Sequence, residues 1–375
     1  MISVWEKESF FAPKDIIIAG SGFVGLWSAF YLKKRNPSLS ITILDRGIIP
    51  TGASTRNAGF ACFGSLSELL ADEQKMGSDQ MLCLVEMRFK GLEKIHKTFR
   101  AEDIDLDMCG GYELFTQDQQ LLAEDLQEQI AYLNELLVPI VKGQTYKLAD
   151  KKIERFKFGG IEHLVRNNLE GYLHSGKLVT SLLQRVQKTG VQVLNNIEIK
   201  SMERVNNRIT LQTNQGIKLT ATQLLICTNG FAKQLLPELD VDPARGQVLL
   251  TSPIEKLPWK GTFHHKQGFY YFRNLGKRIL LGGARNTALT EEKTWSLDTT
   301  PAIQHELERF LQEVLIPGVP HTVEMRWSGT MGVGEEKMPI YRELSPGVFC
   351  CVRMSGMGVA LAPLLGERTA KMMTD

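Results

Sequence analysis

Residues 15–25 read Asp-Ile-Ile-Ile-Ala-Gly-Ser-Gly-Phe-Val-Gly, and this stretch decides the fold. Its apolar start predicts a strand of a parallel sheet, because such strands are buried on both faces and carry continuous apolar runs. From residue 23 to residue 35 apolar side chains recur every three or four positions, which predicts a helix that ends before Pro37. Residues 40–45 are again strand-like. Residues 15–45 are therefore expected to form a right-handed strand–helix–strand unit.

Gly20, Gly22 and Gly25 match the pattern GxGxxG, and Asp45 follows the last glycine by 20 residues (45 − 25 = 20). The glycines allow a tight turn, close approach of the backbone to a pyrophosphate, and packing of the helix on the strand. The helix N-terminus offers unpaired N–H groups and a positive dipole end to phosphates. The Asp45 carboxylate is placed to accept hydrogen bonds from ribose hydroxyls. The pattern predicts a dinucleotide site and leaves NAD and FAD equally open.

Composition excludes several classes of protein. With 375 residues, the chain is long enough for two domains of about 150 residues each. Its 44 basic and 42 acidic residues nearly cancel and form no long basic run, so no nucleic-acid partner is expected. Six cysteines without a CxxC pair favour reduced thiols, and no apolar run is long enough to span a membrane. We expect a cytoplasmic protein with a small-molecule partner.

The rest of the chain mixes helical and strand-like patterns. Amphipathic helices are expected at 80–99, 118–137, 177–189 and 303–315, with Leu122 in the apolar stripe of the second. Alternating strands over 191–220 indicate an antiparallel meander, and residues 223–230 indicate another buried strand. Further strands are expected at 247–251, 269–272 and 278–281, and the segment after Met354 reads as strand, glycine loop and helix. The expected fold class is α/β, or α+β overall.

The loop at residues 51–59 reads Thr-Gly-Ala-Ser-Thr-Arg-Asn-Ala-Gly and directly follows the second strand. Its hydroxyls, arginine and amide are able to wrap a long ligand. An NAD enzyme usually continues here into another strand–helix unit. An ordinary surface loop is the alternative interpretation.

Taken together, GSGFVG at 20–25, GASTRNAG at 52–59, LLICTNG at 224–230 and MSGMGVALAP at 354–363 resemble the D-amino-acid-oxidase-like superfamily of FAD-dependent amine oxidoreductases. Segments at 243–247, 270–273 and 327–329 are most similar to its glycine/sarcosine oxidase and γ-glutamylputrescine oxidoreductase branches. The resemblance implies a Rossmann-like FAD-binding domain from residues 1–60, 150–240 and 325–375. It also implies a substrate domain with a mixed or antiparallel sheet, interleaved with the first, from residues 61–149 and 241–324.

The resemblance also assigns cofactor residues. It places the adenosine diphosphate of FAD at the glycine motif and the acid after it, the pyrophosphate and flavin along the 51–59 loop, and the flavin's pyrimidine end at the C-terminal glycine loop. Covalent attachment is expected after Trp327 in this family, and no cysteine follows there before Cys350, so the FAD is predicted to be non-covalent. The implied residues are Gly20, Gly22, Phe23, Val24, Gly25, Asp45, Arg46, Ser54, Arg56, Asn57, Ala58, Gly59, Gly230, Gly356, Met357, Gly358 and Val359.

Three residues are candidates for the catalytic site. Tyr271 and Arg273 are two apart on a predicted strand and so share one face, where a phenol and a guanidinium can meet a substrate. Trp327 is placed to wall an amine pocket. The alternatives are a half-buried tyrosine, a solvated arginine and a core tryptophan. The resemblance implies hydride transfer from the carbon next to the nitrogen of a small amine or amino acid to flavin N5, followed by hydrolysis of the imine.

The chain departs from the family at two places. Amino-acid-oxidising relatives carry an arginine just after Trp-x-Gly to hold the substrate carboxylate, and this chain has none there, which leaves Arg326, Arg273 or Arg285 as replacements. Sarcosine-oxidase-like members carry a lysine that helps oxygen react, where this chain has Leu280 and Leu281. The electron acceptor, oxygen or another molecule, therefore stays open.

Two other functions are compatible with the sequence: an NAD-linked dehydrogenase, and a flavoprotein subunit without catalytic activity. His264 and His265 are expected in a solvated loop and not at a metal site, because adjacent strand residues face opposite ways and no Cys/His/Asp cluster accompanies them. No metal is expected. Cys350 and Cys351 are expected in the core of a strand.

Overall fold

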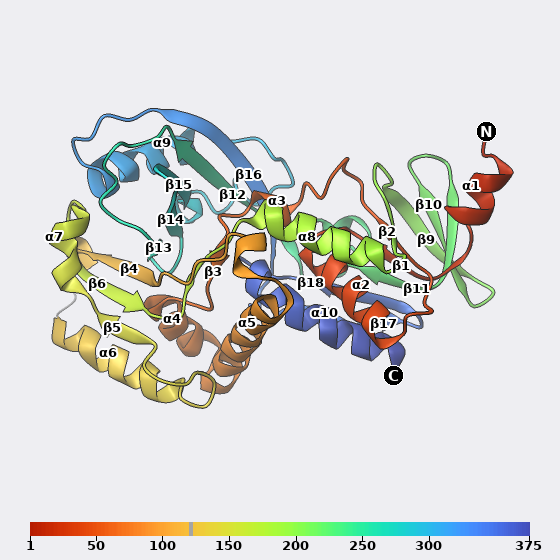
Figure 1. The fold of residues 1–375 in the computed structure, drawn as a ribbon, viewed down its shortest axis with the longest axis horizontal. Helices are drawn as coiled ribbons and strands as arrows, with labels where there is room; N and C mark the ends of the chain where they lie inside the picture. The colour runs from red at the N-terminus through yellow and green to blue at the C-terminus, as the bar shows by residue number, and fades with distance from the viewer. Residues whose placement is uncertain (120–122) are drawn as a thin grey trace. The chain divides into compact units, whose positions relative to one another are not determined.

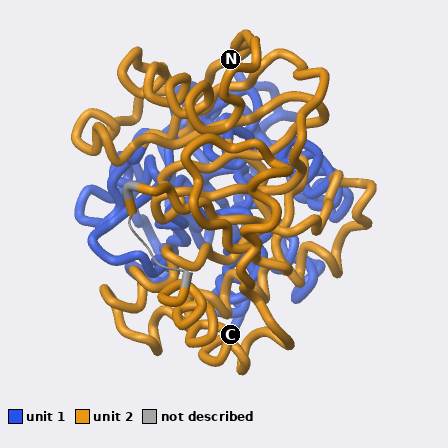
Figure 2. Tube along the Cα trace, turned by 90° about the vertical axis from the view of Figure 1, so that its left-hand side faces the viewer, with its two compact units in different colours: residues 1–56, 175–244, 330–375 blue, residues 57–174, 245–329 orange. Residues whose placement is uncertain are grey.

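The computed structural model describes residues 1–119 and 123–375. The chain folds into two compact units and passes from one to the other after residues 56, 174, 244 and 329 (Figure 2). Unit 1 comprises residues 1–56, 175–244 and 330–375, and unit 2 comprises residues 57–174 and 245–329. Leu122, from the predicted apolar stripe, lies outside the described residues.

Unit 1 is built on a sheet in the order β17-β18-β11-β1-β2-β8. The strands from β18 to β8 run parallel, and β17 pairs antiparallel with β18 at the edge. Strands β9 and β10 extend from β11 as an antiparallel meander. The bounds are β1 Lys14–Ala19, β2 Ile41–Leu44, β8 Gln192–Leu194, β9 Ile199–Val205, β10 Arg208–Thr213, β11 Lys218–Ile226, β17 Ile340–Ser345 and β18 Val348–Val352.

Strand β11 corrects one prediction. The sequence predicts separate strands at 217–220 and 223–230, but the structure has one continuous strand. Its first residues pair antiparallel with β10, and from Ala221 onward it pairs in parallel with β1. A single strand therefore joins the meander to the parallel sheet. Cys350 and Cys351 lie fully buried in β18, as predicted.

Helix α2 (Phe23–Arg35) lies between α8 (Ser175–Lys188) and α10 (Gly358–Thr374), as Figure 1 shows. Close packing of α2 on α10 depends on Gly366, where a Cβ would lie 2.7 Å from the Trp27 Cβ. The predicted unit of β1, α2 and β2 is confirmed. The remaining helices of unit 1 are α1 Val4–Ser9, α3 Ala53–Arg56 and the 3₁₀ helix η4 Asn229–Gln234.

Unit 2 is built on a mixed sheet in the order β16-β12-β15-β14-β13-β4-β6-β5. Strands β13 and β4 run parallel, whereas the pairs from β12 to β13 and from β4 to β5 are antiparallel. A short pair, β3 and β7, stands apart from this sheet. The bounds are β3 Phe60–Ala61, β4 Gly111–Thr116, β5 Tyr146–Leu148, β6 Ile161–Asn167, β7 Gly171–Tyr172, β12 Asp242–Thr251, β13 Thr262–His265, β14 Tyr270–Leu275, β15 Arg278–Gly283 and β16 Val323–Val333.

One face of this sheet forms the main core of unit 2. Phe263 and Phe272 stack with ring centroids 4.7 Å apart, and α9 (Pro301–Phe310) packs against the same cluster. A π-helical turn at Leu311–Leu315 extends α9 to the end predicted for that helix. The other α-helices of unit 2 are α4 Leu66–Met76, α5 Ser78–Thr98, α6 Ala123–Leu136 and α7 Ile153–Phe156.

The observed units differ from the predicted domains mainly at residues 150–174, and also at the short segments 57–60, 241–244 and 325–329. The sequence assigns this segment to the FAD-binding domain, whereas the structure places it in unit 2, because β6 hydrogen-bonds with β4 and β5. Otherwise the mixed α/β architecture confirms the predicted fold class. Over the described ranges, no helix has the length and apolar character needed to cross a membrane.

Candidate functional site

The glycine motif forms the turn between β1 and α2 in unit 1. Gly20 has a φ of +103°, a conformation that side chains rarely adopt. A Cβ on Gly25 would lie 2.0 Å from the carbonyl oxygen of Gly20. The first glycine is thus required by the turn, and the third by the close packing of the helix on the strand, as the pattern predicts.

The N-terminus of α2 suits an anion. Gly22 is the N-cap and has no side chain to cover the first turn, which contains no acidic residue. The Phe23 N–H donates to Ser54 Oγ at 2.9 Å, and a Cβ on Gly22 would lie 3.0 Å from the same oxygen. Two of the predicted pyrophosphate residues, Gly22 and Ser54, are therefore neighbours at a positive helix end. Val24 lies buried in this first turn.

Asp45 stands at the end of β2 beside the motif and is only 9% exposed. Its Oδ2 accepts from the Ser21 N–H at 2.9 Å and from the Ser21 hydroxyl at 2.6 Å, and its Oδ1 accepts from the Gly47 N–H at 2.9 Å. A carboxylate has about four acceptor positions, so one position on Oδ1 stays available. The fixed carboxylate fits the role of a ribose acceptor.

The C-terminal glycine loop lies between β18 and α10. Helix α10 begins at Gly358, and its N-cap residue, Met357, makes no capping hydrogen bond through its side chain. Ser355 has a φ of +48°, and its N–H donates to the Gly332 carbonyl at 2.9 Å. The Met354 N–H donates to Asn229 Oδ1 at 3.1 Å. The loop is thereby held against the ends of β11 and β16.

Gly230 also belongs to this group, because a Cβ there would lie 2.4 Å from the Met331 carbonyl oxygen. A Cβ on Gly20 would lie 3.0 Å from the Cys227 carbonyl oxygen, which connects the two glycine loops. The buried hydroxyls of Thr228 and Thr330 have no hydrogen-bond partner among the described residues. Orphaned polar atoms of this kind are expected where a ligand supplies the partner.

The predicted cofactor residues divide between the two units. Arg46 stacks on the Phe231 ring of η4 at 3.8 Å, and its Nη1 donates to Gln234. Residues 57–59 belong to unit 2, where the Gly59 N–H donates to Asn57 Oδ1 at 2.8 Å. Unit 1 contains Gly20, Gly22, Phe23, Val24, Gly25, Asp45, Arg46, Ser54, Arg56, Gly230, Gly356, Met357, Gly358 and Val359.

The residues of unit 1 fit a dinucleotide cofactor such as FAD. They lie at the carboxyl ends of β1, β2, β11 and β18, where ligands of open α/β sheets bind. Two helices of this unit begin there without an acidic residue in the first turn. Thr228, Asn229 and Met331 were not among the predicted site residues, although the Asn-Gly pair after a buried strand is a signal that marks the first two.

Tyr271 and Arg273 share one face of the unit 2 sheet, as predicted. In the neighbouring strand β13, His264 pairs with Tyr271 and Thr262 pairs with Arg273. Phe272, between them in sequence, belongs to the core on the opposite face. A Cβ on Gly282 would lie 2.5–2.7 Å from atoms of the Tyr271 ring, so this glycine lets the phenol lie across β15. Burial raises the pKa of Tyr271 to about 12, and the phenol stays protonated as a donor at neutral pH.

The same face carries a small apolar cluster, which we call the Tyr271 cluster. Its buried members include Ala58, from the predicted cofactor loop, and Tyr271 and Trp327 pack against them. Leu280 is also a member, whereas Leu281 belongs to the core on the opposite face. The cluster consists of Ala58, Val248, Leu250 and Leu280 with Phe60, Tyr271 and Trp327.

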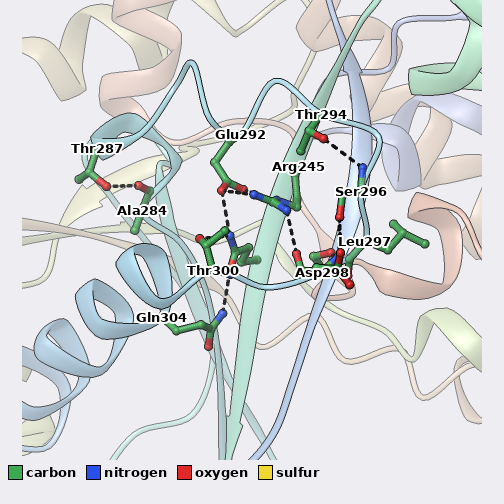
Figure 3. Close-up of polar contacts among 12 residues, drawn as sticks. Arg245, Ala284, Thr287, Glu292, Thr294, Ser296, Leu297, Asp298, Thr300 and Gln304 are labelled. Carbon is green, nitrogen blue, oxygen red and sulfur yellow. Dashed lines mark hydrogen bonds and ion pairs between the residues drawn. The ribbon is translucent and has the colours of Figure 1, made fainter.

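The predicted motif at 243–247 forms a buried polar network (Figure 3). Arg245 donates to both carboxylate oxygens of Glu292, at 2.8 and 2.7 Å, and to the Asp298 carbonyl at 3.0 Å. Gln247 donates to Glu292 at 2.9 Å and to Thr300 Oγ1 at 2.8 Å. Arg245 is thus fully paired and serves the fold.

Arg326 is likewise paired, because it donates to Gln304 Oε1 at 2.7 Å and to Glu308 Oε1 at 2.6 Å. Of the three arginines considered for a substrate carboxylate, Arg326 therefore already has partners within the protein.

His264 and His265 correct another prediction. Both lie in strand β13 and are buried, because β13 is an interior strand between β4 and β14. They face opposite sides, as expected for neighbours on a strand: His265 stacks on Phe310 in the core, and His264 contacts Phe60 on the other face. In the part of the chain that the structure describes, no group of three or more His, Cys, Asp or Glu side chains is arranged to hold a metal.

His264 borders a small cavity with room for about one water molecule. Glu170 and Glu113 also line it, and Glu170 Oε1 accepts from the Phe63 and Gly64 N–H groups at 3.1 and 3.2 Å. Burial, with smaller contributions from Glu68 and Glu113, raises the pKa of Glu170 to about 8, and burial lowers the pKa of His264 to about 4. Both groups are therefore mainly uncharged at pH 7.

Glu170→Gln is expected to remove a pH dependence of stability. The folded chain keeps the Glu170 proton up to about pH 8, whereas an unfolded chain releases it near pH 4.5, so the folded state binds more protons between these values. Stability from this group is present below pH 4.5 and is lost as pH rises toward 8. Relative to Glu170→Gln, the wild type should lose about 2 kcal/mol of unfolding free energy between pH 6 and pH 8. Denaturant titrations at both pH values measure this, and parallel behaviour of the two proteins would refute it.

Comparisons with known proteins agree with this geometry. The family model described as FAD dependent oxidoreductase (DAO) matches residues 15–372. The chain is 23% identical to the probable oxidoreductase OrdL of Rhizobium meliloti (strain 1021) over 369 residues, which cover 96% of this chain and 82% of the relative.

Solved structures that share the fold include a dehydrogenase and an oxidase. The L-proline dehydrogenase from P. horikoshii has a TM-score of 0.76 and 18% identity, covering 96% of this chain and 93% of that one. The glycine oxidase from Geobacillus kaustophilus has a TM-score of 0.74 and 20% identity, covering 96% and 94%. At these identities the solved structures establish the fold, and the family match confirms the resemblance inferred from the motifs. Because that match spans nearly the whole chain, the protein belongs to the DAO family of FAD-dependent oxidoreductases.

Proposed function

We propose that this enzyme uses non-covalently bound FAD to oxidise the C–N bond of a small amine or amino acid. The observation that carries the proposal is the Tyr271 cluster, in which Ala58 of the cofactor loop packs with Tyr271 and Trp327. A residue predicted to line the cofactor thus shares one apolar cluster of unit 2 with two residues predicted to meet the substrate. The glycine oxidase and L-proline dehydrogenase of the same fold have names that denote amine-bearing substrates, which supports this reaction class.

In this proposal the chain's own residues bind FAD, orient the substrate and exclude water from it. Gly22, Ser54 and the α2 N-terminus would hold the diphosphate of FAD, and the Asp45 carboxylate would accept hydrogen bonds from its ribose. The apolar side chains of the Tyr271 cluster exclude water, which favours a neutral amine over its ammonium form. When bound, FAD supplies the hydride acceptor. Tyr271 holds a proton on its phenol oxygen and donates a hydrogen bond that orients the substrate.

Tyr271→Phe is expected to reduce turnover about tenfold while FAD content stays at the wild-type level. The change removes one orienting hydrogen bond and leaves the apolar ring in place, and a lost neutral hydrogen bond is worth about 0.5–1.5 kcal/mol. Steady-state kinetics with flavin quantification measures both effects. Wild-type turnover in Tyr271→Phe would remove the phenol from the active site.

Isotope substitution tests the proposed bond cleavage. An amine that reduces the enzyme's flavin is prepared with deuterium on the carbon next to nitrogen, and flavin reduction is followed without oxygen. Slower reduction of the deuterated amine, together with a carbonyl product and a released amine or ammonia, supports C–N oxidation. A product that retains both hydrogens on that carbon would contradict the proposal. Deuterium on a more distant carbon is the control.

A further inference from the structure

Glu170 is a buried acid that binds the backbone just after strand β3. It lies between β6 and β7 and is 1% exposed. Its Oε1 accepts from the Phe63 and Gly64 N–H groups at 3.1 and 3.2 Å. The carbonyl oxygens of the same two residues accept from Arg88 Nη1 at 3.0 Å and from the Tyr146 hydroxyl at 2.6 Å. Buried side chains thus bind all four backbone groups at positions 63 and 64, which fixes this segment in place.

The second oxygen of Glu170 faces His264. Glu170 Oε2 lies 3.8 Å from His264 Nε2, a buried atom that has no hydrogen-bond partner among the described residues. The space for this oxygen comes from Gly111 of β4, where a Cβ would lie 2.5 Å from Oε2. Glu170 and His264 therefore form an acid–imidazole pair inside unit 2, with the two facing atoms just beyond hydrogen-bond distance.

Phe60 connects this pair to the predicted substrate face. Its ring meets the His264 ring edge-on, with centroids 5.1 Å apart, and the Tyr271 ring edge-on, with centroids 6.1 Å apart. It also precedes the anchored Gly64 by four residues. Glu170 therefore acts on Phe60 through the backbone, and His264 acts on it through the ring. Because Phe60 and Tyr271 both belong to the Tyr271 cluster, this series of contacts ends at the phenol.

We propose that Glu170 and His264 are positioning residues, which in their uncharged state hold Phe60, and through it the Tyr271 phenol, in the orientation that turnover requires. The inference rests on the proposed function and deepens it. Protein interiors are close-packed, so a shift of one side chain displaces its neighbours. A displacement of about 1 Å at a reacting group can cost about 100-fold in rate. The pair thus supports turnover by acting through Phe60.

The pair holds a proton that is lost in mildly basic solution. Burial raises the pKa of Glu170 to about 8 and lowers the pKa of His264 to about 4, so at pH 7 the proton is on Glu170 and the imidazole is neutral. The anion that forms above pH 8 is repelled by Glu68 and Glu113, which weakens the hold on Phe60. The titratable groups around Glu170 are Cys62, Glu68 of α4, Arg88 of α5, Glu113 of β4, Tyr146 of β5 and His264 of β13.

Paired substitutions test the positioning role at pH 7. The measurement is the rate of flavin reduction in the FAD-loaded enzyme, without oxygen and at saturating amine. Glu170→Leu should slow reduction about 10–100-fold, whereas Glu170→Gln keeps an acceptor oxygen and should stay within about threefold of wild type. His264→Leu should also slow reduction, and His264→Phe, which keeps an aromatic ring against Phe60, should restore most of the rate. Wild-type rates in both leucine variants would overturn the inference.

Asp150→Leu is the matched control for a loss of stability. Asp150 also pairs with a histidine, His163, at 2.8 Å, and it accepts from the Leu164 N–H at 2.8 Å. Asp150→Leu and Glu170→Leu should both lower Tm, but only Glu170→Leu should slow flavin reduction measured well below Tm. Equal slowing in both variants would mean that the effect is general and that the inference is wrong. If Glu170→Leu does not fold, the His264 variants and the pH test of Glu170→Gln decide.

The pH test compares Glu170→Gln with wild type between pH 6 and pH 9. Titration of the amine cancels in the ratio of the two rates of flavin reduction. This ratio should rise by at least about threefold between pH 7 and pH 9, because only the wild type forms the buried anion. A ratio that does not change with pH would contradict the inference.

The spectrum of bound FAD without amine distinguishes failure of this inference from failure of the proposed function. Ala58, predicted to line the flavin, shares the Tyr271 cluster with Phe60, so the wild-type spectrum should change near pH 8 and the Glu170→Gln spectrum should not. If amines reduce the flavin equally fast in all variants, the inference fails and the proposed function stands. If no amine reduces it but the spectrum changes only in wild type, the positioning role stands and the proposed function fails. An unchanged spectrum without reduction refutes both.

Discussion

Arg245→Met is expected to lower the free energy of unfolding by about 3–5 kcal/mol. The guanidinium donates to both oxygens of the buried Glu292 carboxylate and to the Asp298 carbonyl (Figure 3). Methionine has a similar length and no charge, so the substitution leaves Glu292 buried without its cation. Breaking one half of a buried pair exposes the full desolvation cost of the other half, which is why the effect is large.

The double variant Arg245→Met/Glu292→Leu serves as the control. It removes both charges and should recover much of the lost stability, because a buried pair and an apolar pair of similar volume often have similar stability. Denaturant unfolding of wild type, both single variants and the double variant gives the coupling between the two residues. A loss below about 1 kcal/mol in Arg245→Met would show that the network contributes little.

Gly22→Leu is expected to weaken FAD binding at least about 100-fold, which corresponds to about 2.7 kcal/mol. Residue 22 is the N-cap of α2, and its missing side chain leaves the first turn uncovered next to Ser54. A leucine there occupies the space in which a diphosphate meets the helix N–H groups. The backbone of Gly22 is extended, with φ −68° and ψ −179°, and any residue can adopt this conformation, so the fold should persist.

Gly22→Ala is the matched control for this substitution. Its Cβ would lie 3.0 Å from Ser54 Oγ, a contact that a small movement of the serine relieves, so FAD binding should weaken much less. Flavin content after purification and titration of the apoprotein with FAD measure both variants. Full flavin content in Gly22→Leu, with normal circular dichroism, would place the diphosphate elsewhere.

Local patterns predicted the parts of the protein that local physics determines. The β1–α2–β2 unit follows from apolar periodicity and three glycines. The structure explains why the first and third of these must be glycine, because a Cβ on Gly20 or Gly25 would lie too close to backbone atoms. The shared face of Tyr271 and Arg273 follows from strand alternation alone. These predictions needed no information on which strands are neighbours in space.

Tertiary arrangement decided the parts that could not be predicted. Strand β6 pairs with two strands distant in sequence, and this pairing moves residues 150–174 into unit 2. His264 is buried because β13 lies inside a sheet, which its own sequence does not reveal. Arg245 is paired because Glu292, 47 residues further along the chain (292 − 245 = 47), lies beside it in the fold. The Nε and Nη1 atoms of Arg273 have no hydrogen-bond partner among the described residues, and neither fact can be seen in the local sequence.

The most direct test of the account is the absorbance of the purified FAD-loaded enzyme after amines are added without oxygen. A small amine or amino acid is expected to bleach the flavin band, with one two-electron equivalent consumed per chain. A protein that retains FAD while no amine in a broad panel changes its spectrum would contradict the account and would instead fit a flavoprotein subunit without catalytic activity.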